Sequence, residues 1–419
     1  MSDPVLIVGG GVAGCALAVG LVRAGRRAIL VERESEAGDH FRGEFMQPAA
    51  VAALTRLGFG PVVDGAGSAT LDELVFIDIA AWPDRLAGST SIRYPAGQSA
   101  RGLPHQTLVR GLRDVARSVL GDDFWEGAQA TPQGDLGDGA TLPDFVLAAP
   151  GRQARVQPAW VVGCDGRSSQ TRRWMQGKAL TTRTTPAPLA TRDLLVGAEL
   201  LEPPACPGRV EVVRTPGEGT VWLFPLGADR QRVYLNIGAD DAPKGAAGLT
   251  VALQQRLDRL APLLGPMTVA PGSTRAAPAG TAWLGPPARG RALLAGDATA
   301  ICTPLSGQGM SCALLHVESL MTLLGETDPV PSALGAQYAP LVEARFRQVQ
   351  LLSLGLVHQF FSRSPAVRAL SPWVMRRWNA DPGLRARIGE WFGGQGGPPL
   401  RRREFIRLLG VGPRPRAWA

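Results

Sequence analysis

The stretch from Val5 to Val22 carries no charged side chain over eighteen positions. A segment of this length and apolarity suits a membrane-spanning helix, a secretory signal, or the first strand and helix of a nucleotide-binding fold. A signal peptide begins with a basic region, but the only charged side chain before Val5 is Asp3. The choice that remains is between a membrane anchor and a nucleotide-binding fold.

Three glycines in this stretch decide against the membrane anchor. They form the spacing G-x-G-x-x-G, directly after a strand-length run at 5–8 that is β-branched at three of its four positions. An apolar helical segment at 15–21 then closes at Gly25, and a second apolar strand at 28–31 ends on Glu32. The order of strand, glycine turn, helix, strand and acid is the dinucleotide-binding fingerprint.

Each residue type in the fingerprint has a physical role. Gly9 permits the tight turn, Gly11 lets the backbone approach a pyrophosphate, and Gly14 lets the helix pack close to the strand. The helix N-terminus offers free N–H groups to phosphates, and Glu32 is placed to accept hydrogen bonds from a ribose. The cofactor-binding residues predicted in this segment are Gly9, Gly11, Ala13, Gly14, Glu32 and Arg33.

Composition narrows the class of protein. The five cysteines show no C-x-x-C spacing and the four histidines are scattered, so we expect a reduced, cytoplasmic protein without a metal site. The net charge of +8 comes almost entirely from arginine, without a nucleic-acid-binding motif. We therefore expect a solvated basic surface, no nucleic-acid partner and no transmembrane segment.

Two further turns come after predicted strands. Asp165-Gly166 comes after the strand at 161–164, and Asp297 follows the strand at 292–295. After Asp297 come the segment PLSGQGM and a helix at 311–323, and its glycines would let backbone N–H groups approach a ligand. Either aspartate could instead cap its own turn. Because three such turns lie at strand ends, we predict one shared ligand and a nucleotide-binding domain that is discontinuous in sequence.

The segments between these turns are rich in strands, expected at 74–79, 91–94, 210–213, 220–224 and 232–237. Turn residues at 225–229 predict a hairpin between the last two. Their one-sided pattern predicts an antiparallel sheet with one face over something apolar. Three- and four-residue spacing of apolar residues predicts helices from 333 to 387.

Taken together, these motifs resemble the FAD-dependent monooxygenases of the para-hydroxybenzoate hydroxylase type, the class A flavoprotein hydroxylases. The resemblance spans roughly residues 4–350 and rests on GGGVAG, GCDGRSS and GDA with PLSGQGM, in family order. The stretches RGEFMQP at 42–48 and PHQTLVRGL at 104–112 are similar to squalene-epoxidase-like natural-product epoxidases. This chain departs from the pattern at Ala300, where many members have histidine, and near Thr107, where epoxidases have arginine.

The resemblance implies the fold and further site residues. The fold class is α/β: a discontinuous Rossmann-like FAD-binding domain (1–70, 101–178 and 280–330), an inserted, mostly antiparallel β-sheet substrate domain (71–100 and 179–279), and a C-terminal helical region (331–419). In the family the residue equivalent to Arg42 contacts FAD, and the one equivalent to Gln106 lies beside the flavin. The resemblance adds these cofactor-binding residues: Arg42, Gln106, Asp165, Gly166, Asp297, Pro304, Gly307, Gly309 and Met310.

It also implies a reaction. NADPH or NADH, bound transiently, reduces a non-covalently bound FAD, which takes up O₂ as a C4a-hydroperoxide. The terminal oxygen then hydroxylates or epoxidises an apolar, aromatic or polycyclic natural-product intermediate. Water must be excluded, or the hydroperoxide decays to H₂O₂. No catalytic residue can be assigned; His105 and Glu44 are candidates, and each also has an ordinary structural role as its alternative.

Two alternatives remain open at this point: a double-bond reductase of the geranylgeranyl reductase type, and a non-catalytic FAD-binding partner subunit. A flavin-dependent halogenase is disfavoured because no lysine precedes Lys178 and the Trp-x-Trp-x-Ile-Pro segment is missing. Substrate identity, the choice of nicotinamide and the oligomeric state, monomer or homodimer, are not specified by the sequence.

Overall fold

The computed structural model describes residues 3–38, 44–65, 67–79, 88–136, 141–176, 185–186, 193–215, 219–238, 241–325, 331–356, 365–394 and 406. The first large sheet has six strands in the order β20-β21-β12-β1-β2-β8, and its pairs are parallel except for β20 with β21. The strands are β1 (Val5–Val8), β2 (Ala28–Glu32), β8 (Phe124–Glu126), β12 (Trp160–Gly163), β20 (Ala288–Arg289) and β21 (Ala292–Leu294).

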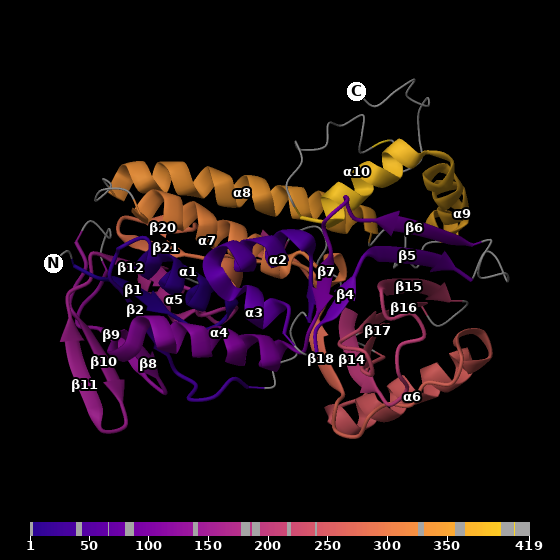
Figure 1. The fold of residues 1–419 in the computed structure, drawn as a ribbon, viewed down its shortest axis with the longest axis horizontal. Helices are drawn as coiled ribbons and strands as arrows, with labels where there is room; N and C mark the ends of the chain where they lie inside the picture. Colours follow the sequence, from indigo (N-terminus) through magenta and orange to yellow (C-terminus); the bar gives the residue numbers. More distant parts are fainter. Residues whose placement is uncertain are drawn as a thin grey trace.

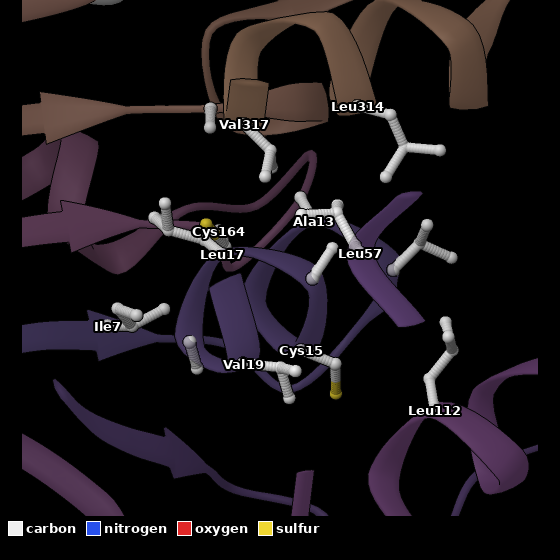
Figure 2. Close-up of a cluster of buried hydrophobic side chains, with 14 of the residues drawn as sticks. Ile7, Ala13, Cys15, Leu17, Val19, Leu57, Leu112, Cys164, Leu314 and Val317 are labelled. Atoms are coloured by element: carbon white, nitrogen blue, oxygen red, sulfur yellow. The ribbon is translucent and has the colours of Figure 1, made fainter. Parts of the chain in front are cut away.

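Both faces of this sheet are covered, which explains why its strands are apolar without alternation. On one face α1 (Val12–Arg23) packs between α4 (His105–Leu120) and α7 (Gly309–Gly325), as Figure 1 shows. Figure 2 shows Leu17 and Val19 of α1 in this core with Leu112 of α4 and Val317 of α7. The opposite face is covered by the ribbon of β9 (Gln129–Pro132), β10 (Phe145–Ala149) and β11 (Arg152–Val156), and by α5 (Gln170–Gln176).

The second large sheet has seven strands in the order β18-β14-β17-β16-β15-β5-β6. Its pairs are antiparallel, except that β15 runs parallel to β5. The strands are β5 (Glu73–Asp78), β6 (Ser89–Arg93), β14 (Asp193–Leu200), β15 (Arg209–Thr215), β16 (Gly219–Pro225), β17 (Gln231–Gly238) and β18 (Arg275–Pro278).

Alternation along these strands divides the side chains between two cores. Val221, Val233 and Leu235 face α6 (Gly245–Leu264). Trp222 and Tyr234 face the other way, into the core that includes α9 (Pro365–Ala380) and α10 (Pro382–Phe392). The sheet thus has one face over an apolar core, as expected, and α6 covers its other face as well, which the sequence analysis did not predict.

The remaining elements are the long helix α8 (Pro331–Leu356) and a set of short helices and strands. In Figure 1 α8 lies along α7 and extends toward α10. The short elements are β3 (Phe45–Met46), α2 (Pro48–Leu54), η1 (Thr55–Phe59), α3 (Gly60–Val63), β4 (Ala69–Leu71), β7 (Ala100–Gly102), η2 (Gly121–Asp123), β13 (Thr185–Pro186), β19 (Ala282–Trp283), η4 (Gly296–Ala298), β22 (Ala300–Ile301) and η5 (Pro304–Ser306).

The structure confirms the expected fold class of a parallel α/β sheet, an inserted and mostly antiparallel sheet, and C-terminal helices. The strands of the two sheets come from the chain segments predicted for the two domains, although the domain boundaries themselves stay a prediction. The basic segment at 401–409 lies outside the described residues, apart from Ile406. Across the helices that the structure describes, none has the length and apolarity to cross a membrane.

A buried ion pair joins the two inserted segments of the second sheet. Arg214 on β15 donates from Nε to Asp78 Oδ1 on β5 at 3.0 Å and from Nη2 to Asp78 Oδ2, and both side chains are almost fully buried. Removing one partner leaves a buried charge without its counter-ion, which costs about 3–5 kcal/mol.

We therefore predict that Asp78→Ala lowers the free energy of unfolding by about 3–5 kcal/mol, measured by urea unfolding. Asp123→Ala, which removes the exposed partner of Arg27, is the matched control and should cost less than about 1 kcal/mol. Equal losses in the two variants would contradict a special role for the buried pair.

Candidate functional site

The glycine turn after β1 is held by very close backbone contacts. Gly9 has φ +108°, and a Cβ there would lie 2.5 Å from the carbonyl oxygen of Cys164. A Cβ on Gly14 would lie 1.8 Å from the carbonyl oxygen of Gly9. At Gly11, by contrast, an added Cβ meets no protein atom within 4 Å. The turn is thus closed where it packs on the protein and open at Gly11, where a ligand would approach.

Glu32 lies directly beside this turn. Its carboxylate accepts hydrogen bonds from the backbone N–H groups of Gly10 at 2.6 Å and Glu34 at 2.8 Å. Arg113 places Nη2 3.4 Å from the Glu32 carboxylate and donates from Nε to the Gly10 carbonyl at 3.0 Å. Sequence reasoning missed Arg113. The sequence feature that could have identified Arg113 is its position on the apolar face of α4, four residues after the buried Val109.

Two adjoining cavities lie beside the turns. The smaller one, about 430 Å³, is lined by Gly9, Glu32, Arg33 and Asp165 among others. The larger one, about 550 Å³, extends toward the second sheet. Their common lining residues are Gly11, His105, Cys164, Gly166 and Ser168. Volumes of this size are typical of ligand sites, and two that share a wall suit one elongated ligand.

The two walls of the larger cavity differ in character. One wall is made by the second and third predicted turns and the start of α1, with Ala13, Gly166, Asp297, Pro304, Gly307, Gly309 and Met310. The other is made by the second sheet, with Leu195, Val210, Trp222, Phe224 and Tyr234. The structure therefore places the predicted turn residues opposite an apolar and aromatic wall that sequence reasoning did not identify residue by residue.

Besides Glu32, three predicted residues lie away from the cavities or are hydrogen-bonded within the protein. Gly14 packs on Gly9 and does not line either cavity. The Asp165 carboxylate accepts from Ser169 Oγ at 2.5 Å and from the backbone N–H of Gln170 at 2.7 Å. It therefore caps the start of α5, which agrees with the alternative that this aspartate has a structural, capping role. Gln106 donates from Nε2 to the Ala37 carbonyl at 2.8 Å. Arg42 lies outside the described residues.

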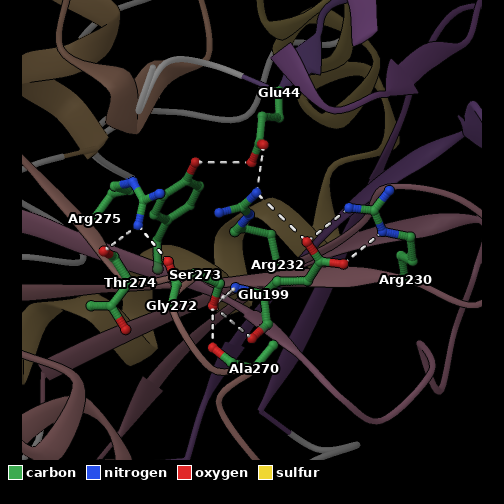
Figure 3. A network of polar contacts seen from close by, with 10 residues as sticks. Glu44, Glu199, Arg230, Arg232, Ala270, Gly272, Ser273, Thr274 and Arg275 are labelled. Carbon is green, nitrogen blue, oxygen red and sulfur yellow. Dashed lines mark hydrogen bonds and ion pairs between the residues drawn. The ribbon is translucent and has the colours of Figure 1, made fainter. Parts of the chain in front are cut away.

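A polar network enters the larger cavity from the second sheet. Glu44 is buried and accepts from Arg232 Nη2 at 2.7 Å and from the Tyr234 hydroxyl at 3.3 Å. Figure 3 shows Arg232 between Glu44 and Glu199, with Arg230 bound to Glu199 on the outer side. Burial raises the pKa of the Tyr234 phenol, which therefore stays a neutral hydrogen-bond donor. Both catalytic candidates, Glu44 and His105, line this cavity.

His316 is hydrogen-bonded to the backbone of the turn that carries Asp297. Its Nδ1 accepts a hydrogen bond from the Gly296 backbone N–H at 3.2 Å, and the side chain is 4% exposed. Desolvation first, and the positive charge of Arg345 second, lower the pKa of His316 to about 3. A neutral imidazole can accept the Gly296 hydrogen bond, whereas an imidazolium cannot.

The residues that line the cavities fit a dinucleotide. At Gly11 and Gly309 an added Cβ would meet no protein atom within 4 Å, and both glycines line the larger cavity. Gly11 precedes α1 and Gly309 begins α7, so backbone N–H groups and the positive ends of two helix dipoles face this space.

Comparison with known proteins gives the same ligand. Residues 2–328 match a family model described as FAD binding domain. Squalene epoxidase erg1 of Schizosaccharomyces pombe is 26% identical over 251 residues, covering 57% of this chain and 50% of that protein. Dialkyldecalin synthase of Streptomyces rugosporus is 27% identical over 331 residues, covering 78% of this chain and 66% of that protein. The chain thus spans half of the first relative and just under two-thirds of the second.

Solved structures share the fold. The p-nitrophenol 4-monooxygenase PnpA from Pseudomonas putida superposes with a TM-score of 0.76 at 18% identity, covering 95% of this chain and all of that one. The Diels-Alderase PyrE3 of pyrroindomycin biosynthesis superposes with a TM-score of 0.69 at 22% identity, covering 94% of this chain and 80% of that one. At these identities the likeness shows the fold. The family match confirms the resemblance stated from the sequence and FAD as the cofactor.

We predict that Gly11→Ala yields a folded but colourless protein, because its methyl group would project into space that the pyrophosphate needs. The unfolding free energy of the FAD-free protein should stay within about 0.5 kcal/mol of wild type. Gly14→Ala is the matched control: its methyl group would collide with Gly9 and should cost about 1–3 kcal/mol or more. Yellow Gly11→Ala protein at full FAD occupancy would contradict the site.

We also predict a pH effect from His316. Its pKa falls from 6.5 to about 3 on folding, so the unfolded chain binds more protons between these values. Its contribution to stability is complete above the unfolded pKa and is lost as the pH drops toward the folded one, by about 1.4 kcal/mol per pH unit. His316→Gln, which keeps an acceptor, should flatten the curve of unfolding free energy against pH in that window. Parallel curves for variant and wild type would count against the buried neutral imidazole.

Proposed function

Because the chain belongs to the FAD binding domain family, we propose that it is an FAD-dependent monooxygenase that consumes NADPH or NADH and O₂. The proposed reaction inserts one oxygen atom, by hydroxylation or epoxidation, into an apolar aromatic or polycyclic intermediate. The observation that carries this proposal is the cavity of about 550 Å³ with a glycine-rich, cofactor-binding wall facing an apolar, aromatic wall. Bound FAD supplies the redox chemistry and the activation of O₂.

The second sheet would exclude water from the reacting centre. Trp222 and Phe224 project from β16 into the cavity, and Leu195 and Val210 flank them. Contact between Phe224 and Tyr234, with ring centroids 5.2 Å apart, stiffens this wall. A dry chamber favours oxygen transfer over loss of the activated oxygen to water, and flat aromatic side chains suit an apolar polycyclic substrate.

Glu44 and Tyr234 would orient the substrate. They are polar groups in the otherwise apolar part of the cavity, and Arg232 holds the Glu44 carboxylate in place through the 2.7 Å contact. We propose that a substrate hydroxyl donates to Glu44 or accepts from Tyr234. For a phenol, the Glu44 carboxylate could also take the proton; for an alkene, orientation alone suffices. His105 lies where the two cavities meet, so it is better placed to contact the cofactor than the substrate.

The nicotinamide co-substrate would bind transiently at the mouth of the larger cavity. Arg167, which comes directly after the second turn, is exposed and lines that cavity. Its guanidinium is suited to the pyrophosphate of NADPH or NADH. We propose the reducing cytoplasm as the compartment, because all five cysteines are free thiols.

A second candidate function uses the same chamber without oxygen transfer. The relative whose match covers 78% of this chain is a dialkyldecalin synthase, and PyrE3 is described as a Diels-Alderase. A cyclisation in the apolar cavity would conserve the mass of the substrate and would consume neither O₂ nor nicotinamide. The double-bond reductase and the non-catalytic subunit stay further alternatives.

The decisive experiment screens candidate substrates with the purified FAD-loaded chain under isotopically labelled O₂. A monooxygenase is expected to show substrate-stimulated NAD(P)H oxidation and a product that gains one labelled oxygen. An isomeric product without NAD(P)H oxidation indicates cyclisation, and a product gaining two hydrogens indicates a reductase. Yellow protein that shows none of these with any substrate would argue for the non-catalytic subunit.

We predict that Tyr234→Phe and Glu44→Gln each raise the half-saturating substrate concentration about tenfold or more. Each substitution removes a proposed hydrogen-bond partner of the substrate hydroxyl, which would then be buried without one. Steady-state NAD(P)H oxidation and coupling to product would measure the effect. Glu199→Gln is the control, since Glu199 belongs to the same network but does not line the cavity. The orienting role fails if all three variants behave alike.

A further inference from the structure

Two free cysteines meet behind the third predicted turn. The Cys302 thiol donates to the Cys312 sulfur at 3.7 Å. Cys302 lines the larger cavity, whereas Cys312 is buried in the first turn of α7. The chain between them contains Pro304, Gly307, Gly309 and Met310, which line the same cavity on its cofactor-binding side. Neither thiol has a part in the proposed oxygen transfer.

We propose that Cys302 and Cys312 are a modification site: hydrogen peroxide converts this thiol pair into a disulfide that closes the cofactor-binding segment 302–312 into a covalent loop. The two sulfurs are already in contact, so closing to the ~2 Å of a disulfide requires side-chain rotation and a small backbone adjustment. Cys302 borders the cavity, so a small oxidant there comes next to Cys302, whose sulfur lies 3.7 Å from that of Cys312.

A buried cation next to the pair supports the assignment. Arg345 on α8 is 9% exposed and, within the described residues, donates to three neutral oxygens: Gln308 Oε1 at 3.2 Å, the Gly394 carbonyl at 2.9 Å and Gln348 Oε1 at 2.9 Å. Among the residues that the structure describes, no carboxylate forms an ion pair with Arg345. A buried guanidinium without a carboxylate is costly unless another anion is near, and a thiolate would serve.

The electrostatic surroundings select Cys312 as that anion. The hydrogen bond from the Cys302 thiol, and after it the charge of Arg345, hold the pKa of Cys312 below its ordinary value, although desolvation and Asp297 oppose them. The other buried cysteines lack this support. Desolvation raises the pKa of Cys15 to about 12 and raises that of Cys164 as well. Since the thiolate is the reactive form, Cys312 should react while Cys15 and Cys164 stay inert.

The reaction balances with hydrogen peroxide as the only oxidant. The Cys312 thiolate attacks one peroxide oxygen, the O–O bond breaks, and a sulfenic acid and hydroxide form. The Cys302 sulfur then displaces the sulfenic hydroxyl as the S–S bond forms, and the Cys302 proton leaves with a hydroxide as water. In sum, two thiols and one hydrogen peroxide give one disulfide and two waters.

The test uses the full-length wild-type chain, with and without FAD, treated with a small excess of hydrogen peroxide. We expect a loss of two of the five titratable thiols in denaturant, an intact mass lower by two hydrogens, and a peptide cross-link between Cys302 and Cys312. Dithiothreitol should restore all five. These readouts need neither substrate nor nicotinamide, so they can fail or succeed independently of the proposed monooxygenase activity.

Variants separate this site from general thiol oxidation. In Cys302→Ser a sulfenic acid should persist at Cys312 and react with dimedone, whereas Cys312→Ser should give no cross-link. Cys206→Ser, which removes the partly exposed cysteine outside the pair, is the control and should oxidise as wild type. Arg345→Met should slow disulfide formation roughly tenfold, and Arg345→Lys should preserve much of the rate. An unchanged thiol count after peroxide, or an equally fast loss of two thiols in Cys312→Ser, overturns the proposal.

Discussion

The candidate cofactor site depends on the close approach of the α1 backbone to the turn that precedes it, and of that turn to the neighbouring strand end. Gly14 leaves no room for a side chain against the Gly9 carbonyl, and Gly9 leaves none against Cys164 of the neighbouring strand end. These contacts bring the first two glycine-bearing turns into one position at the edge of the parallel sheet. Because the sheet register fixes both strand ends, segments more than 150 residues apart in sequence build one wall.

The sequence analysis could predict those secondary-structure elements that a local residue pattern specifies. The glycine spacing, the β-branched runs and the acid at Glu32 define a strand–helix–strand unit, and the structure has β1, α1 and β2 there. Patterns could not specify partners distant in sequence. Arg113 reads as an ordinary helix cation until folding places it 3.4 Å from Glu32. Likewise, Trp222, Phe224 and Tyr234 read as strand residues, and only the packing of α6 on one face shows that they face the cavity on the other.

The side chains of the aspartate motifs illustrate the limit of motif reasoning. Asp165 and Asp297 occupy similar positions after parallel strands, yet Asp165 caps α5 at the side of the smaller cavity, whereas Asp297 lines the larger cavity. The next element in the chain also differs: α5 begins a few residues after Asp165, whereas Asp297 lies within η4, and β22 and η5 separate it from the start of α7. A short motif thus fixes the backbone path, but the element after it decides the side-chain role.

The parallel pairing of β15 with β5 has a consequence for synthesis of the chain. Residues 73–78 leave the ribosome well before residues 209–215, their partners in the sheet. Until then β6 is the sheet partner available to β5, and a sheet of two strands is marginally stable alone. The nascent chain must therefore carry an apolar strand with one unpaired edge through more than a hundred further residues, and such an edge is prone to wrong pairing until β15 is made.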